Sequence, residues 1–78
     1  MMANVTLFDV QRGDVVLTAA LLTRIQSGAI TLILMTETAE VKLDAQAVAA
    51  VLAGKSLKVF HSIHGHRALN AAVLNNLT

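Results

Sequence analysis

Residues 30–36 restrict the fold of this chain more than any other segment does. Successive side chains of a β-strand point to opposite faces. As a strand, this segment would place Ile30, Leu32 and Leu34 on one face and Ile33 and Met35 on the other. A strand that is apolar on both faces is a central strand and needs cover on both sides. The segment therefore predicts a sheet that is packed on both faces.

Other segments indicate further strands around this one. Residues 5–10 are β-branched and aromatic, which favours a strand, and Gly13 marks the turn after them. Pairing is expected to continue or bend through residues 37–43, where apolar and charged residues alternate. Residues 56–63 indicate another strand.

Two helices are expected in the second half of the chain. Asp44 can cap a helix over residues 45–53, with Leu43 packing on Val48 as a hydrophobic staple. Gly54 can adopt the left-handed conformation that ends such a helix. A second helix is expected over residues 66–77, where apolar residues recur at four-residue spacing.

Residues 15–25 fit two structures. As a helix, the segment has Asp14 as a cap and Gly28 just past its end. As a strand, it alternates apolar residues with Thr18 and Arg24. Periodicity does not separate the two for so apolar a run, and the turn signals and threonines favour a strand.

These segments predict an α+β fold. We expect a small, mainly antiparallel sheet of three to five strands packed against two short helices, in the order β-β-β(-β)-α-β-α. A chain of 78 residues without a linker or a recognised internal repeat is expected to form one domain, residues 1–78.

The apolar content predicts a second chain. The sequence is 55% hydrophobic and 14% charged, and a domain of this size has little stability to spare. If residues 15–25 are a strand, two short helices cover only one face of the sheet, and the other face would drive self-association. We therefore expect a homo-oligomer, most simply a dimer. The candidate contact residues are Ile30, Leu32, Ile33, Leu34 and Met35. If residues 15–25 are instead a helix, they can cover the sheet, and a monomer becomes possible.

Basic and histidine residues gather in the segment 55–67. All five acids precede residue 45, so this segment is locally cationic and could bind an anionic ligand. The candidate residues are Lys55, Lys58, His61, His64, His66 and Arg67. Gly65 is expected to open the turn into the last helix, whose free N–H groups could then add to such a site. Nucleic acid is a less favoured partner, because no basic stripe or stacking surface is evident.

Two other interpretations of this segment remain open. His61, His64 and His66 have a spacing that could hold zinc, copper or nickel, although a fourth ligand is not evident in the sequence. The segment can also be a solvated polar loop. We expect no cofactor and treat the metal site as a weak candidate.

Neither catalysis nor a membrane location is expected. No paired acids, nucleophile with a base or nucleotide loop appears, so the chain is expected not to be an enzyme. Its apolar stretches are shorter than a membrane-spanning helix, and the absence of cysteine fits a reducing cytoplasm. The sequence thus favours a non-enzymatic interaction or assembly module, with a small regulatory domain that binds an anion or nucleic acid as the alternative.

Overall fold

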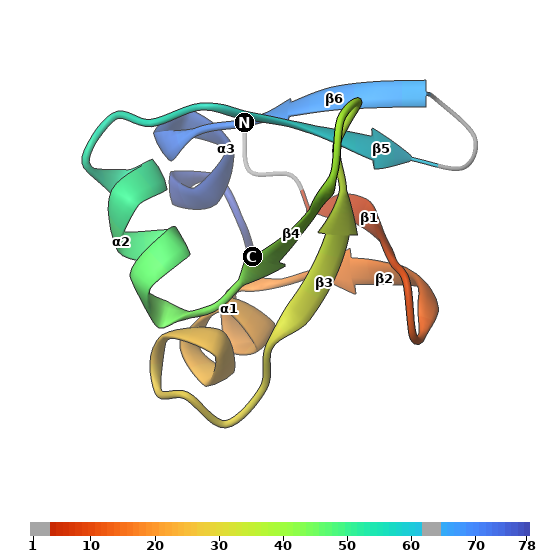
Figure 1. The fold of residues 1–78 in the computed structure, drawn as a ribbon. Coiled ribbons are helices and arrows are strands. Elements are labelled where there is room, and N and C mark those ends of the chain that lie inside the picture. The colour runs from red at the N-terminus through yellow and green to blue at the C-terminus, as the bar shows by residue number, and fades with distance from the viewer. Residues whose placement is uncertain (1–3, 62–64) are drawn as a thin grey trace.

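The chain consists of three successive β-hairpins, each followed by a helix (Figure 1). This computed structural model describes residues 4–61 and 65–78, without the side chain of His61. The first unit comprises β1 (Val5–Asp9), β2 (Gly13–Leu17) and α1 (Ala19–Gln26). The second comprises β3 (Leu32–Met35), β4 (Glu40–Leu43) and α2 (Ala45–Leu52). The third comprises β5 (Leu57–His61), β6 (Gly65–Leu69) and α3 (Ala71–Asn75).

The passage from hairpin to helix is the same in all three units. The last residue of the second strand is a buried leucine in each case: Leu17, Leu43 and Leu69. These leucines recur at intervals of 26 residues, from 17 to 43 and from 43 to 69. A helix N-cap follows each leucine, as Thr18, Asp44 and Asn70, and its side-chain oxygen accepts a backbone N–H three residues later at 2.9–3.1 Å. A buried leucine and a capping residue thus begin each helix.

The first two helices also end in the same way. Gly28 donates its N–H to the carbonyl of Ile25, and Ala29 donates to Arg24, at 3.1 and 3.0 Å. After α2, Gly54 and Lys55 repeat this pair of hydrogen bonds, each at 3.0 Å. Both glycines have positive φ, 84° and 123°, which a residue with a Cβ adopts at a cost. The two helices therefore end in Schellman motifs, and the predicted stop at Gly54 is confirmed.

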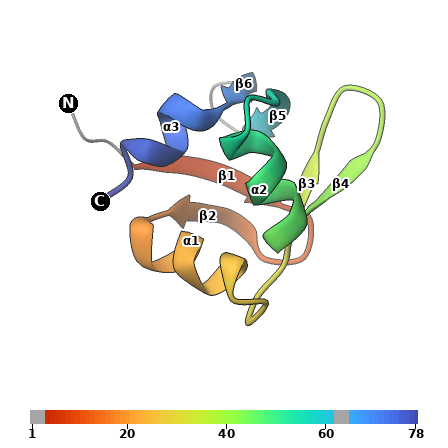
Figure 2. The same ribbon diagram turned by 90° about the vertical axis from the view of Figure 1, so that its left-hand side faces the viewer.

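The helices cover one side of the strands (Figure 2). Strands β2-β1-β3-β4 form a four-stranded sheet with antiparallel pairing throughout, and β5 and β6 form a separate antiparallel pair. The first strands of the three units, β1, β3 and β5, each pack against the other two. Their inward side chains meet those of the helices in one hydrophobic core of Leu7, Leu17, Ile25, Leu32, Leu34, Leu43, Val48, Val51, Val59, Leu69, Leu74 and Leu77.

The last described residue closes the three units into a ring. The N–H of Thr78 donates to the side-chain oxygen of Asn4, just before β1, at 2.8 Å. The carbonyl of Thr78 accepts the N–H of Ala19, the first residue of α1, at 3.1 Å. The end of the third unit is therefore held by both ends of the first.

The predicted α+β class with a mainly antiparallel sheet is confirmed, but two expectations about its elements were wrong. Residues 15–25 are neither one strand nor one helix: the chain leaves β2 at Leu17 and enters α1 at Ala19, with Thr18 as the cap. Since α1 buries Ile25 in the core, this segment supplies cover for the sheet.

The expected helix over residues 66–77 was also wrong. Its first part is strand β6, and only Ala71–Asn75 are helical, because Asn70 caps a new helix there. Gly65 therefore begins a strand and not a helix, so the expectation that it would bring free helix N–H groups to the 55–67 segment was wrong. The element order therefore contains a third helix and a sixth strand. The three hairpin–helix units are also an internal repeat, which the sequence analysis did not recognise.

The remaining elements lie near their predicted places. The strands expected over 5–10, 30–36 and 56–63 are confirmed as β1, β3 and β5, with shorter bounds, although 62–63 lie outside the described residues. The helix over 45–53 is confirmed as α2, with Ala53 as its C-cap. The pairing expected to continue or bend through residues 37–43 is confirmed, because β4 in this segment pairs with β3.

Candidate functional site

The face of the sheet away from the helices carries an apolar surface. In β1 and β3, the residues at alternate positions to the core leucines point away from the helices. Antiparallel pairing of Asp9 with Leu34 aligns these outward residues of the two strands on one face. We name this surface the outer apolar face and define it as Phe8, Val10, Val16, Ile33, Met35 and Phe60.

Phe60 joins the two sheets at this face. The rings of Phe8 and Phe60 lie 5.8 Å apart at 86°, which is an edge-to-face contact. The His66 ring also makes an edge-to-face contact with Phe60, with the ring centroids 5.9 Å apart at 74°. Phe8 and Phe60 are each half-buried, so they connect the separate β5–β6 pair to the four-stranded sheet.

The outer apolar face holds two of the three large apolar residues that are exposed among the described residues. Val16 is 52% exposed and Val10 is 39% exposed. The third is Leu52, 38% exposed, on helix α2. Because Val48 and Val51 of α2 lie in the core beneath the sheet, Leu52 belongs to the helical side of the molecule.

Only part of the predicted self-association set lies on this face. Leu32 and Leu34 are 0% exposed, so they belong to the core of the folded chain. Ile30 is half-buried and packs against the same core. Ile33 and Met35 are half-buried on the outer apolar face and remain available to a partner. The sequence did not single out Phe8, Val10, Val16 or Phe60 as contact residues.

Lys58, a predicted anion ligand, is paired within the chain. Its ammonium lies 3.0 Å from the Glu37 carboxylate, and both side chains are exposed. The hydrogen bond and charge of Lys58 lower the pKa of Glu37, and the charge of His66 lowers it further. An acid from the turn between β3 and β4 thus balances part of the positive charge of the 55–67 segment.

The other predicted anion ligands are dispersed. Lys55 lies in the turn after α2, and Arg67 lies on β6, opposite Val59 and therefore on the other face of that strand from His66. Both are exposed. His64 and the side chain of His61 lie outside the described residues. Among the described residues, no group of three or more His, Cys, Asp or Glu side chains could hold a metal ion, so the histidine metal site stays an untested prediction.

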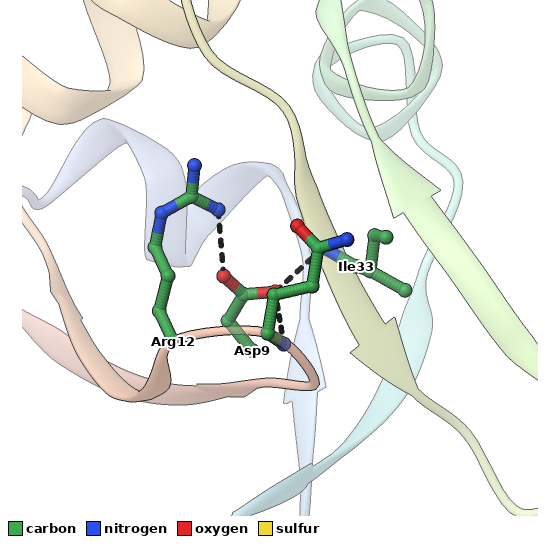
Figure 3. A network of polar contacts seen from close by, with 4 residues as sticks. Asp9, Arg12 and Ile33 are labelled. Atoms are coloured by element: carbon green, nitrogen blue, oxygen red, sulfur yellow. Dashed lines mark hydrogen bonds and ion pairs between the residues drawn. The ribbon is translucent and has the colours of Figure 1, made fainter.

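Asp9 forms a buried polar network that the sequence analysis missed (Figure 3). Its side chain is 0% exposed and 2.8 Å from the guanidinium of Arg12, which reaches solvent. It also accepts the backbone N–H of Ile33 at 3.0 Å and that of Gln11 at 3.4 Å. The sequence does contain a signal for the burial of Asp9: it lies two residues after Leu7, so both side chains point to the inner face of β1.

The Asp9 network has a structural role. Burial raises the pKa of Asp9, but the hydrogen bonds from Arg12, Ile33 and Gln11, together with the charge of Arg12, outweigh it and leave the pKa below its ordinary value of 3.8. The carboxylate is therefore charged at neutral pH and ties the β1–β2 turn to strand β3.

No family model, curated protein or solved structure matches this chain. Within the described part of the chain, each helix is too short or too polar to traverse a bilayer.

Proposed function

We propose that this chain is a non-enzymatic interaction module that forms a homodimer through its outer apolar face. The observation that carries the proposal is the exposure of Val10 and Val16 on the same face of the sheet as the half-buried Phe8, Ile33 and Met35. Exposed apolar residues that gather on one face mark an interaction site, whereas single scattered ones do not. Leu52, on the helical side, is such a single residue.

The charges around this face suit a second copy of the chain. In a twofold dimer the same surface meets itself, so it needs both signs of charge or neither. The outward residues of the neighbouring strand β4 are Glu40 and Lys42, and both are exposed. Glu37 and Lys58 form a neutral pair beyond them. Asp14 of β2, exposed opposite Phe8, adds one acid to this rim. A rim with both signs of charge in nearly equal number favours self-association over attraction to a strongly charged partner.

Dimer formation would also stabilise a small fold. A chain of 78 residues buries a limited share of its surface when it folds. A partner that binds only the folded state stabilises it by mass action. We place this module in the cytoplasm as part of the proposal, because the chain contains no cysteine.

An anion-binding or nucleic-acid-binding role for residues 55–67 ranks second. Glu37 neutralises Lys58, and Arg67 and His66 lie on opposite faces of β6, so the described cations do not converge on one point. If this second role is correct, replacing His61, His64, His66 and Arg67 together with glutamine should abolish binding of an anion such as inorganic phosphate while leaving the dimer dissociation constant unchanged. A wild type that binds no phosphate would contradict the second role.

The test is the mass of the chain in solution. Sedimentation equilibrium at micromolar concentrations should show a dimer for the wild type and a monomer for Val16→Lys, because a lysine at this position would bring two like charges into the dimer contact. Leu52→Lys is the matched control: it also replaces an exposed apolar residue with lysine but should remain dimeric. A wild-type chain that stays monomeric across this range would contradict the proposal.

A further inference from the structure

The four-stranded sheet has two open edges that differ in protection. β2 and β4 are its outer strands. Open edges offer unpaired backbone groups to other chains, and proteins protect them with short strands and with charged side chains, lysine above all. β4 has four residues, and its outward side chains are Glu40 and Lys42. β2 has five residues and no lysine or proline, and its outward side chains are Asp14 and Val16. Val16 is the most exposed large apolar residue of the described part of the chain.

The pattern of backbone hydrogen bonds shows where the peptide groups of Val16 point. The N–H of Val10 donates to Ile33 in β3 at 2.9 Å. Backbone groups of successive residues in a strand point in opposite directions, so those of Leu7, at an alternate position, point toward β2. Leu7 lies opposite Val15 in the register. The N–H and C=O of Val16, the next residue of β2, therefore point away from β1, out of the open edge.

We propose that the dimer forms by antiparallel pairing of β2 with β2 of a second copy of this chain, giving one continuous sheet across the twofold axis. This inference rests on the proposed self-association and narrows its contact to the β2 edge of the outer apolar face, at Val16. The residues of that face on β1 and β3 lie on one side of the joined sheet and stay outside the strand contact. Edge pairing uses both features of Val16: its outward peptide groups gain hydrogen-bond partners, and its side chain gains contact with the side chain opposite it in the new strand pair. A twofold axis makes the contact identical for both copies and closes the assembly at two.

Proline substitutions at the two edges test this geometry. Val16→Pro removes the outward N–H of β2 and breaks no bond to β1, because the N–H of Val16 does not point to that strand. Lys42→Pro is the matched control on the other edge: Ile33 points its N–H to Asp9 at 3.0 Å, so its register partner Lys42 points away from β3. Val16→Pro should raise the dimer dissociation constant by about tenfold or more, since each dimer loses two symmetry-related hydrogen bonds. Lys42→Pro should leave it within about threefold.

Amide hydrogen exchange on the wild type provides a readout that needs no variant to fold. The Val16 amide should exchange more slowly above the dimer dissociation constant than below it, because pairing protects it. The Lys42 amide should exchange at the same rate under both conditions.

The outcomes separate this inference from the proposed function. A wild type that is dimeric, with a Val16 amide that gains no protection, overturns edge pairing and leaves self-association standing. A folded Val16→Pro variant with an unchanged dimer dissociation constant would also overturn edge pairing and leave self-association standing. A wild type that is monomeric at every concentration overturns both.

Discussion

Asp9 places a charged carboxylate where it has no contact with solvent. Burying a charge is unfavourable unless hydrogen bonds and an opposite charge compensate for it. Arg12 supplies the charge, and the backbone N–H groups of Ile33 and Gln11 supply two more donors. The network joins the β1–β2 turn to β3, which is the contact between the first and second units.

Replacing this carboxylate should weaken the fold. Asp9→Asn keeps an acceptor for Ile33 but loses the ion pair with Arg12, so we expect the free energy of unfolding to fall by about 1–3 kcal/mol. Urea denaturation at neutral pH measures the change. Glu40→Gln is the control, because it removes an exposed carboxylate from the same sheet, and it should change stability by less than about 0.5 kcal/mol. Equal effects of the two substitutions would refute a structural role for Asp9.

The pH dependence of stability should reflect the same residue. The folded-state pKa of Asp9 lies below the ordinary value of 3.8, at which the carboxyl titrates in the unfolded chain. The unfolded chain therefore takes up the proton first as pH falls, so the contribution of Asp9 is complete above pH 3.8 and is lost as pH decreases through the folded-state value. Urea titrations between neutral and strongly acidic pH should show a smaller acid-induced loss in Asp9→Asn than in the wild type. Parallel curves would contradict this linkage.

At the scale of the elements, the capping residue decides where each helix begins. Asp44 accepts the N–H of Ala47 at 2.9 Å, and Thr18 and Asn70 do the same in their units. All three stand between a buried leucine and an alanine. The strand ends at that point because the cap has extended backbone geometry and the next residue is helical.

Removal of one cap should destabilise its unit measurably. Asp44→Ala should lower the free energy of unfolding by about 1 kcal/mol, because one N–H in the first turn of α2 loses its acceptor. Asp44→Asn retains an acceptor for this N–H and should lower the free energy of unfolding by only a few tenths of a kcal/mol. Gln46→Ala, an exposed position in the same helix, is the control for a change of helix propensity. Chemical denaturation of the three variants distinguishes a cap from a surface effect: if Asp44→Asn costs as much as Asp44→Ala, the hydrogen bond is not the cause.

For the whole molecule, the ring of three units should tolerate new chain ends between units. Thr78 is hydrogen-bonded to Asn4 and Ala19, so a short glycine–serine linker can join Thr78 to Asn4 in place of residues 1–3 without displacing either strand or helix. A circular permutant opened between Gly28 and Ala29, both exposed, should unfold cooperatively, within about 2 kcal/mol of the wild type.

The control permutant opens the chain inside a unit. New ends between Val48 and Ala49 interrupt α2, whose Val48 and Val51 are fully buried. This permutant should lose cooperative unfolding in a urea titration followed by circular dichroism. If it were as stable as the permutant opened at Gly28, the hairpin–helix unit would not be the structural unit of this fold.

The repeat was hard to detect because few residues are identical among the units. Leucine at 17, 43 and 69 and alanine at 19, 45 and 71 are shared by all three. Elsewhere the requirement is physical: the cap can be Thr, Asp or Asn, and the buried position near the end of the helix can be Ile25, Val51 or Leu77. Because different residues satisfy the same requirement, the three units share few identical residues and the repeat is hard to detect by comparing their sequences.

The sequence by itself determined the elements whose signals are local. Helix α2 has its cap and its glycine stop within the segment, and β3 is a short run of residues that is apolar on both faces, which is typical of a central strand. The α+β class followed from these elements. The candidate surface followed only in part: Ile33 and Met35 were identified, but their separation from the buried Leu32 and Leu34 was not.

Tertiary structure decided between strand and helix where the local sequence fits both equally well. Residues 15–25 are apolar apart from Thr18, Thr23 and Arg24, so periodicity does not separate strand from helix. The division at Thr18 depends on the core that receives both Leu17 and Ile25. Strand β6 likewise depends on its partner β5, because His66, Arg67 and Ala68 have no pattern that excludes a helix. Pairing with a distant segment supplies hydrogen bonds that no local pattern encodes, and for that reason the exposed edge at Val16 appeared only in the folded molecule.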